Sequence, residues 1–390
     1  MQLNILFYIA IILISGFIFS RLAKFVKLPN VTGYLIAGLI IGPYALKLIP
    51  LDITNQMELV SEIALAFIAF SIGAEFKISY LKKVGITPIV IAIFEGLTAT
   101  FAVTAILVLL KFDIKIALLI GAIASATAPA ATIMVVKQYD AKGPVTETLL
   151  SVVALDDAVA LIAFGFAMAI VKSLQNPNEH SVIMSLITPI IEIIGSILLG
   201  LLLGMLFAIP LRFFRKDYNR LIITTAFVFL GSSLATMLGL SSLLLCMSMS
   251  AMLTNISTAG DDVIKLVDKV TPPIYLMFFV VSGMELDIFN LPQIGMLGII
   301  YIVCRVIGKV GGAFIGAATM KAPKPVKKYL GFTLLPQAGV ALGLSLIAAN
   351  TLPEVGQTIR SVILCATLIY ELTGPAITKI FLKKAGEISV

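Results

Sequence analysis

Apolar runs of about 20 residues follow one another along the whole chain, and they leave few folds open to it. Hydrophobic residues make up 59% of the 390 residues and charged residues only 13%, whereas ordinary soluble domains carry about 25% charged residues. The strands of a membrane β-barrel would instead alternate over about 10 residues. The sequence therefore predicts an all-α integral membrane protein. The first run lacks the basic start and cleavage site of a secretory leader, so none is expected.

Breaks at Pro, Gly and charged residues divide the apolar runs into thirteen expected transmembrane helices. Their expected spans are 3–22, 31–48, 57–76, 84–110, 115–137, 144–172, 184–211, 219–237, 240–254, 264–284, 291–320, 328–350 and 356–382. Most of the 28 Lys and Arg residues fall in the loops after odd-numbered helices and at the C-terminus. Because basic residues accumulate in cytoplasmic loops, we expect the N-terminus outside and the C-terminus in the cytoplasm. This asymmetry also explains the net charge of +7, so no nucleic-acid partner is expected.

An internal repeat is visible in two segments. AFIAFSIGAEFKI at 66–78 aligns with LMFFVVSGMELDI at 276–288, which pairs Gly73 with Gly283. The order of the helices then predicts two six-helix repeats joined by one connecting helix, with expected boundaries at 1–176, 181–216 and 217–390. A shift of seven helices reverses the direction across the bilayer, so the repeats are inverted, which is typical of transporters.

Two expected helices in corresponding positions of the repeats contain helix breakers. SATAPAATIMVV carries Pro129, and LLPQAGVALGL carries Pro336. Paired interruptions predict crossed discontinuous helices that expose backbone groups to an ion site; simple proline kinks are the alternative. Thr127 and Thr132 flank the first break and Gln337 lies in the second, so all three are candidate supporting residues.

Asp156 and Asp157 lie side by side in the apolar run SVVALDDAVALIAF. An acid at the centre of a membrane helix costs about 2.5–3.5 kcal/mol, so two adjacent acids indicate a function. Neighbours on a helix point about 100° apart, so each reaches a different partner. Carboxylate oxygens suit hard cations, and the chain has no Cys/His cluster for zinc or iron. The alternative is a purely structural pair of charges.

The run VCRVIGKVGGAF supplies the opposite charge. Arg305 and Lys309 are four residues apart and share one helix face. Lysine loses its proton more readily than arginine when buried, so Lys309 is the candidate proton carrier and Arg305 the structural cation. The repeat alignment places Arg305 opposite Glu95 and predicts a Glu95–Arg305 pair. The alternative is that the two basic side chains snorkel to an interface.

Five further acids lie in or near expected helix ends, where interfacial positions are expected for most of them: Glu62, Glu75, Glu192, Glu285 and Glu371.

The aspartate pair, the TAPAAT break and the late GKVGG helix together resemble the monovalent cation/proton antiporter superfamily. Within it the chain is similar to bacterial electrogenic sodium/proton antiporters of the NapA type, over essentially its whole length. The resemblance implies that Asp157 is the central carboxylate for sodium and protons. It also implies that Asp156 pairs with Lys309 and that Thr127 lies at the break of the fifth helix, where it is a candidate second ligand of sodium.

The resemblance implies an architecture as well. Residues 81–176 and 291–390 would form a mobile core, and residues 1–80 and 217–290 a scaffold that forms a homodimer. The core would move as an elevator in the cell membrane. Related potassium-efflux systems tend to replace the first acid of the pair and carry a nucleotide-binding domain after the last helix. This chain stops soon after Lys384, so the expectation is that this regulation is absent or has been truncated away. The chain keeps the first acid of the pair, which favours sodium.

The expected function is therefore exchange of sodium, or lithium, for protons by alternating access, with no enzymatic activity and no cofactor. A potassium/proton antiporter is the main alternative. A sodium-coupled organic-anion symporter shares the inverted repeats but does not need adjacent acids. An intramembrane aspartyl protease needs acids from two helices that share a water, and a gated channel would not saturate at enzyme-like rates.

Overall fold

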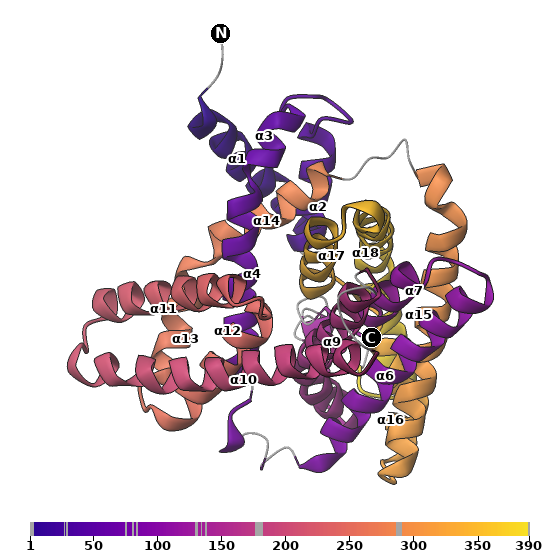
Figure 1. Cartoon of the computed structure of the whole chain (residues 1–390). Coiled ribbons are helices and arrows are strands. Elements are labelled where there is room, and N and C mark those ends of the chain that lie inside the picture. Colours follow the sequence, from indigo (N-terminus) through magenta and orange to yellow (C-terminus); the bar gives the residue numbers. More distant parts are fainter. Residues whose placement is uncertain are drawn as a thin grey trace. The chain divides into compact units, whose positions relative to one another are not determined.

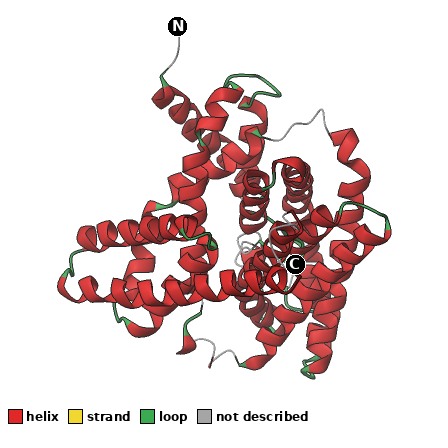
Figure 2. Cartoon of the chain, viewed as in Figure 1, coloured by secondary structure: helices red, strands yellow, loops and turns green. Residues whose placement is uncertain are grey.

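The computed structural model describes residues 4–388 apart from 27, 29, 75, 80–81, 83–84, 129–131, 134, 137–138, 176–181 and 286–290. Within these residues helices are the only regular secondary structure (Figure 2). Eight of them are long and apolar enough to cross a membrane, and five further apolar helices are 10–17 residues long. The prediction of an all-α membrane protein is confirmed.

The chain divides into two compact units, which we describe separately. The first unit comprises residues 1–61, 87–160 and 275–390, and the second comprises residues 62–86 and 161–274. The helices in chain order are α1 (Ile5–Phe25), α2 (Asn30–Ile41), α3 (Leu51–Gln56), α4 (Glu58–Ala74), α6 (Ile86–Leu109), α7 (Ile114–Ile123), α9 (Pro144–Gln175), α10 (Val182–Phe213), α11 (Asp217–Met237), α12 (Ser242–Ile256), α13 (Gly260–Val270), α14 (Pro272–Met284), α15 (Leu291–Thr319), α16 (Lys324–Thr333), α17 (Gly339–Thr351) and α18 (Pro353–Lys384) (Figure 1).

In the first unit, α18 packs against α2, α7, α15, α16 and α17, and Figure 1 shows α17 and α18 side by side. A second set of contacts joins α1 to α2 around buried side chains that include Ile12, Ala37 and Val280. Gly38 allows α2 to approach α14 closely, because a Cβ there would lie 2.8 Å from the backbone nitrogen of Met284. Small residues at such crossings are typical of membrane helices.

In the second unit, α10, α11 and α12 pack against one another, and α13 covers α11 and α12. The rings of Phe207 and Phe227 stack with centroids 4.7 Å apart. α13 has a polar face, on which Asp262 accepts a hydrogen bond from Arg220 at 2.8 Å. This helix therefore differs from the apolar spans around it.

Several helices begin where a side chain satisfies the free amides of the first turn. Asn4 accepts from the Leu6 amide in front of α1, and Asp113 accepts from the Lys115 amide in front of α7. α9 begins at a proline, and its cap comes from the other end of the chain, because Glu387 accepts from the amides of Val145 and Thr146 at 2.7 Å each. Local side chains thus cap α1 and α7, whereas the cap of α9 is distant in sequence.

The expected spans and the observed helices differ mainly at breaks. The span expected at 328–350 is two helices, α16 and α17, separated by residues 334–338. The span expected at 115–137 stops as a regular helix at Ile123, earlier than Pro129, which lies outside the described residues. The span at 264–284 is likewise divided in two, because α13 ends at Val270 and α14 begins at Pro272, whereas the span at 57–76 corresponds to the single helix α4. The count of thirteen, the division into repeats and the orientation remain predictions.

Candidate functional site

The two interrupted stretches meet inside the first unit. After α7 ends, the amide of Ala128 donates to the carbonyl of Pro336 at 2.8 Å, so the break after α7 contacts the break between α16 and α17. Gln337 strengthens this contact, because its Nε2 donates to the carbonyl of Ile123 at 3.0 Å. The expected pair of breaks is present and forms one crossing.

Arg305 binds the carbonyls that the breaks leave free. Its three guanidinium nitrogens donate to the carbonyls of Ala124 at 2.9 Å, Ala126 at 2.7 Å and Leu335 at 2.7 Å. The side chain is fully buried, and its guanidinium lies 4.4 Å from the centroid of the Tyr370 ring. A fixed positive charge thus offsets the partial negative charge of the carbonyl end of α7.

The expected Glu95–Arg305 pair is wrong. Glu95 instead binds Lys309, whose Nζ lies 3.0 Å from Oε1 and 2.8 Å from Oε2 of the carboxylate. The reason is geometric, because the planar guanidinium reaches both breaks, whereas Lys309, one turn further along α15, faces α6. The repeat alignment predicted which helices meet but not which residue of α15 meets Glu95.

Lys309 is fully buried and has four partners. Besides Glu95, its Nζ donates to the Ser125 carbonyl and to Thr127 Oγ1 at 2.6 Å each. Asp156 Oδ2 lies 3.6 Å from Nζ, so the expected Asp156–Lys309 ion pair is present. It is longer than the ion pair with Glu95.

Asp156 and Asp157 are buried on α9 and have different surroundings. Thr127 Oγ1 donates to Asp156 Oδ2 at 2.7 Å, which links this carboxylate to Lys309 through one hydroxyl. Asp157 is 6% exposed, and among the described residues it has no hydrogen bond and no ion pair. One aspartate is therefore held by the protein, while the other has free ligand atoms.

Glycines on α15 explain why Lys309 and Glu95 meet. A Cβ on Gly312 would lie 2.6 Å from the Cα of Glu95, and a Cβ on Gly308 would lie 2.6 Å from the Cα of Ala99. Glycines four residues apart share one face and let two backbones approach closely. α15 therefore packs directly on α6, with the lysine and the glutamate beside the contact.

The remaining predicted residues support the crossing and do not reach the carboxylates. Thr132 is buried and donates to the Ala128 carbonyl at 3.4 Å. Gln337 accepts from the hydroxyl of Tyr301 at 2.9 Å. Tyr301 was not predicted, although its spacing shows it, because Tyr301, Arg305 and Lys309 follow one another at four-residue intervals on one helix face.

Three of the acids expected at interfaces have partners inside the protein. Glu371 is 1% exposed and accepts from Thr32 at 3.2 Å, so for this residue the expectation is wrong. Glu285 pairs with Arg360, and Glu192 lies 3.2 Å from Lys172. Glu62 is exposed, and Glu75 lies outside the described residues.

The charges of the cluster do not balance. Glu95, Asp156 and Asp157 face a single ammonium group, that of Lys309, so with every group ionised the cluster carries two excess negative charges. Uncompensated charge is costly within a membrane, and oxygen ligands suit protons and hard cations. A buried cluster of acids around one lysine, at the crossing of two broken helices, is typical of the class of membrane transporters.

The match of the sequence to a known protein family identifies the particular family. Residues 9–384 match the family described as the transmembrane sodium/hydrogen exchangers, and the chain belongs to this family. It is therefore a member of the monovalent cation/proton antiporter superfamily and a multi-pass protein of the cell membrane.

Known proteins resemble the chain over different lengths. It is 27% identical to Na(+)/H(+) antiporter 1 of Methanocaldococcus jannaschii in a match that covers 51% of this chain and 46% of that relative. It is 25% identical to the Na(+)/H(+) antiporter NhaS4 of Synechocystis over 97% of this chain and 96% of that protein. The solved structure of the sodium proton antiporter MjNhaP1 from Methanocaldococcus jannaschii at pH 8 has a TM-score of 0.81, with 19% identity, and covers 97% of this chain and 98% of that one. This likeness shows the fold.

Proposed function

We propose that the chain exchanges sodium for protons across the cell membrane at the cluster formed by Glu95, Asp156, Asp157 and Lys309. One observation carries the proposal. Asp157 is buried beside a held carboxylate, and its Oδ1 has no hydrogen-bond partner among the described residues. The chemistry of the relatives, which are named for sodium and protons, supports the same assignment.

The two ions compete for one set of oxygens. Sodium binds the carboxylates of Asp157 and Asp156 and the hydroxyl of Thr127, and displaces protons from the cluster as it does so. Protons that arrive from the other side displace sodium. Because the sodium-loaded and protonated states exclude each other, the two ions move in opposite directions without any further coupling. No cofactor is required, since both ions are substrates.

The exchange is proposed to be electrogenic, with two protons for one sodium or lithium ion. Lys309 carries one of the protons, and its release weakens the hold on Glu95 and Asp156, both within 3.6 Å of its Nζ. One net charge then crosses in each cycle. A potential of 100 mV contributes about 2.3 kcal/mol to that charge, and each unit of pH difference contributes about 1.36 kcal/mol per proton.

We further propose the architecture implied by the NapA-type resemblance, with thirteen spans, inverted repeats, an external N-terminus and an elevator-like core in a homodimer. Two contacts support the inverted repeats. Gly73 approaches the backbone of Met247 on α12, and its aligned partner Gly283 approaches the backbone of Leu35 on α2. Gly73 of the first repeat thus contacts the second repeat, and Gly283 of the second repeat contacts the first in the same way. A two-fold relation between the repeats requires such a pair of contacts.

The test uses purified protein in liposomes that contain a pH-sensitive dye. Asp157→Asn is expected to abolish sodium-dependent dequenching, while Glu147→Gln, an exposed acid on the same helix, leaves it unchanged. An imposed membrane potential changes the wild-type rate if a net charge crosses. The same dequenching assay with lithium or potassium in place of sodium gives the ion preference. Full activity of Asp157→Asn would remove Asp157 from the mechanism.

A further inference from the structure

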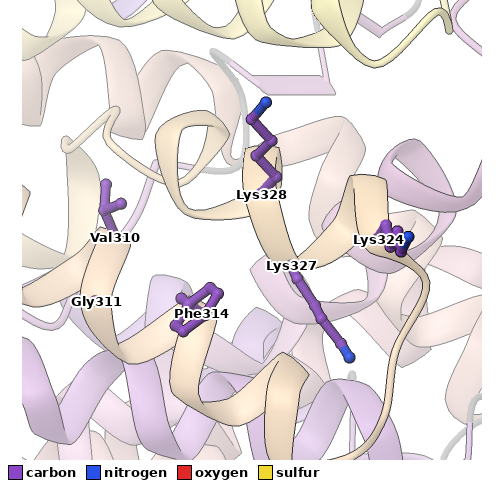
Figure 3. Close-up of a pocket in the computed structure, with 6 residues that line it drawn as sticks. All are labelled: Val310, Gly311, Phe314, Lys324, Lys327 and Lys328. Carbon is purple, nitrogen blue, oxygen red and sulfur yellow. The ribbon is translucent and has the colours of Figure 1, made fainter.

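An open pocket of about 560 Å³ lies outside the cation cluster, between α15 and α16 (Figure 3). Half of its lining is apolar and half is basic. The residues that line it are Val310, Gly311 and Phe314 of α15, and Lys324, Lys327 and Lys328 of α16.

The three lysines are unusually placed for a helix start. They lie in the first two turns of α16, where Lys327 and Lys328 follow Lys324 by three and four residues and are therefore its neighbours on the helix surface. The N-terminal end of a helix is electropositive and normally attracts acids. The first turn of α16 has no acidic residue, and Pro323 in front of it makes no side-chain cap.

Nothing in the described part of the chain neutralises these lysines, because none of the ion pairs there involves Lys324, Lys327 or Lys328. Figure 3 shows their ammonium groups pointing in different directions, as repelling charges do. Each side chain is long and flexible, so all three are able to turn toward one bound anion. An anion at this position would relieve both the mutual repulsion and the unfavourable helix end.

The apolar half of the pocket selects the kind of anion. The side chain of Phe314 is 54% exposed, and it lies on a helix whose candidate membrane span ends at Thr319. The glycine face of α15 is covered by α6, so the side with Phe314 is the uncovered side. A soluble anion would leave this apolar surface without a partner, whereas a phospholipid places phosphate and hydrocarbon next to each other.

We propose that this pocket binds an anionic phospholipid. The headgroup phosphate lies among Lys324, Lys327 and Lys328, and an acyl chain packs along Val310 and Phe314. Basic pockets at the end of a membrane span are a known physical basis for selecting anionic headgroups. The pocket shares α15 with the cluster, but its lysines lie on α16, which carries no residue of the cluster.

The experiment measures heat stability of the purified full-length protein in a neutral detergent by size-exclusion chromatography after heating. The probes are phosphatidylglycerol, phosphatidylcholine and inorganic phosphate. We expect phosphatidylglycerol alone to stabilise the wild type. A triple variant, Lys324→Gln with Lys327→Gln and Lys328→Gln, is expected to need at least about tenfold more lipid for the same effect. Phe314→Ala is expected to weaken the effect less.

A matched control removes three positive charges elsewhere, on exposed residues at the end of α10 and in the loop that follows it: Arg212→Gln, Arg215→Gln and Lys216→Gln. This control is expected to respond to phosphatidylglycerol like the wild type. Equal loss in the control, full response in the lysine variant, or stabilisation by inorganic phosphate would each overturn the proposal. If the triple variant does not fold, Lys327→Gln alone is compared with the wild type, and native mass spectrometry counts the phosphatidylglycerol molecules bound to each. Fewer bound molecules in the variant support the proposal, and an equal number would overturn it.

Discussion

At the scale of single residues, the site depends on how one ammonium group is shared. Lys309 contacts two carboxylates, a hydroxyl and a carbonyl within 3.6 Å. Arg305, one turn earlier, contacts carbonyls and the Tyr370 ring. In the proposed mechanism, the same face of one helix carries a fixed charge that supports the breaks and an exchangeable charge that faces the acids. This division follows from chemistry, because arginine keeps its proton and lysine is able to release it.

Glu95→Gln tests the contribution of the third carboxylate. The substitution keeps the size of the side chain and removes one negative charge from the cluster, so sodium should bind less tightly. We expect the sodium concentration for half-maximal dequenching to rise several-fold, with the protein still folded. The exposed Glu62→Gln serves as control. An unchanged sodium dependence in Glu95→Gln would show that Glu95 has a structural role only.

Contacts between single side chains are the feature of this protein that its sequence predicts least well. The aspartate pair, Lys309 and both breaks were identified because charges and prolines are rare in apolar runs. The partner of Glu95 was predicted wrongly, since a weak repeat alignment fixes which helices correspond but leaves the rotation of each helix open. Glu371 was expected at an interface because its position along the sequence does not reveal what covers it.

At the scale of helices, close packing sets the geometry of the site. α15 approaches α6 through glycines at every fourth position, and Ala128 hydrogen bonds to Pro336 across the breaks. The glycine spacing is visible in the sequence, but its partner helix is not. Nor does the sequence show that Glu387 caps α9 from 242 positions away, since a cap is predictable only when it lies next to the helix it serves.

Gly312→Ala tests this packing. A Cβ at this position would lie 2.6 Å from backbone atoms of Phe94 and Glu95, so α15 has to move away from α6. We expect lower transport because Lys309 moves with the helix. Gly311→Ala is the matched control, since a Cβ there meets nothing within 4 Å. Equal activity of the two variants in the dye assay would contradict the proposed importance of this contact.

Glu387→Ala tests the long-range cap of α9. The carboxylate accepts from two amides and from the Thr146 hydroxyl, each at 2.7 Å. Loss of an N-cap costs about 0.5–2 kcal/mol, so the temperature of half-loss in the heated size-exclusion assay should fall. Sodium affinity should not change, because α9 carries its aspartates more than two turns further on. A variant as stable as the wild type would show that the cap contributes nothing.

At the scale of the whole molecule, the sequence predicted the class of the protein better than its detail. Hydrophobic length is an average over many residues, so single errors cancel and the all-α membrane prediction is confirmed. Helix boundaries depend on local breaks, and three expected spans are interrupted in the structure. The division into a moving core and a fixed scaffold concerns a cycle of several states, and it remains a prediction.

The central claim is that one cluster of buried acids holds either sodium or protons. The most direct measurement adds sodium to the purified protein in weakly buffered detergent solution and follows the pH with an indicator dye. We predict that protons are released on sodium binding, that more sodium is needed as the pH falls, and that Asp157→Asn releases none. Sodium binding without proton release at every pH tested would contradict the account.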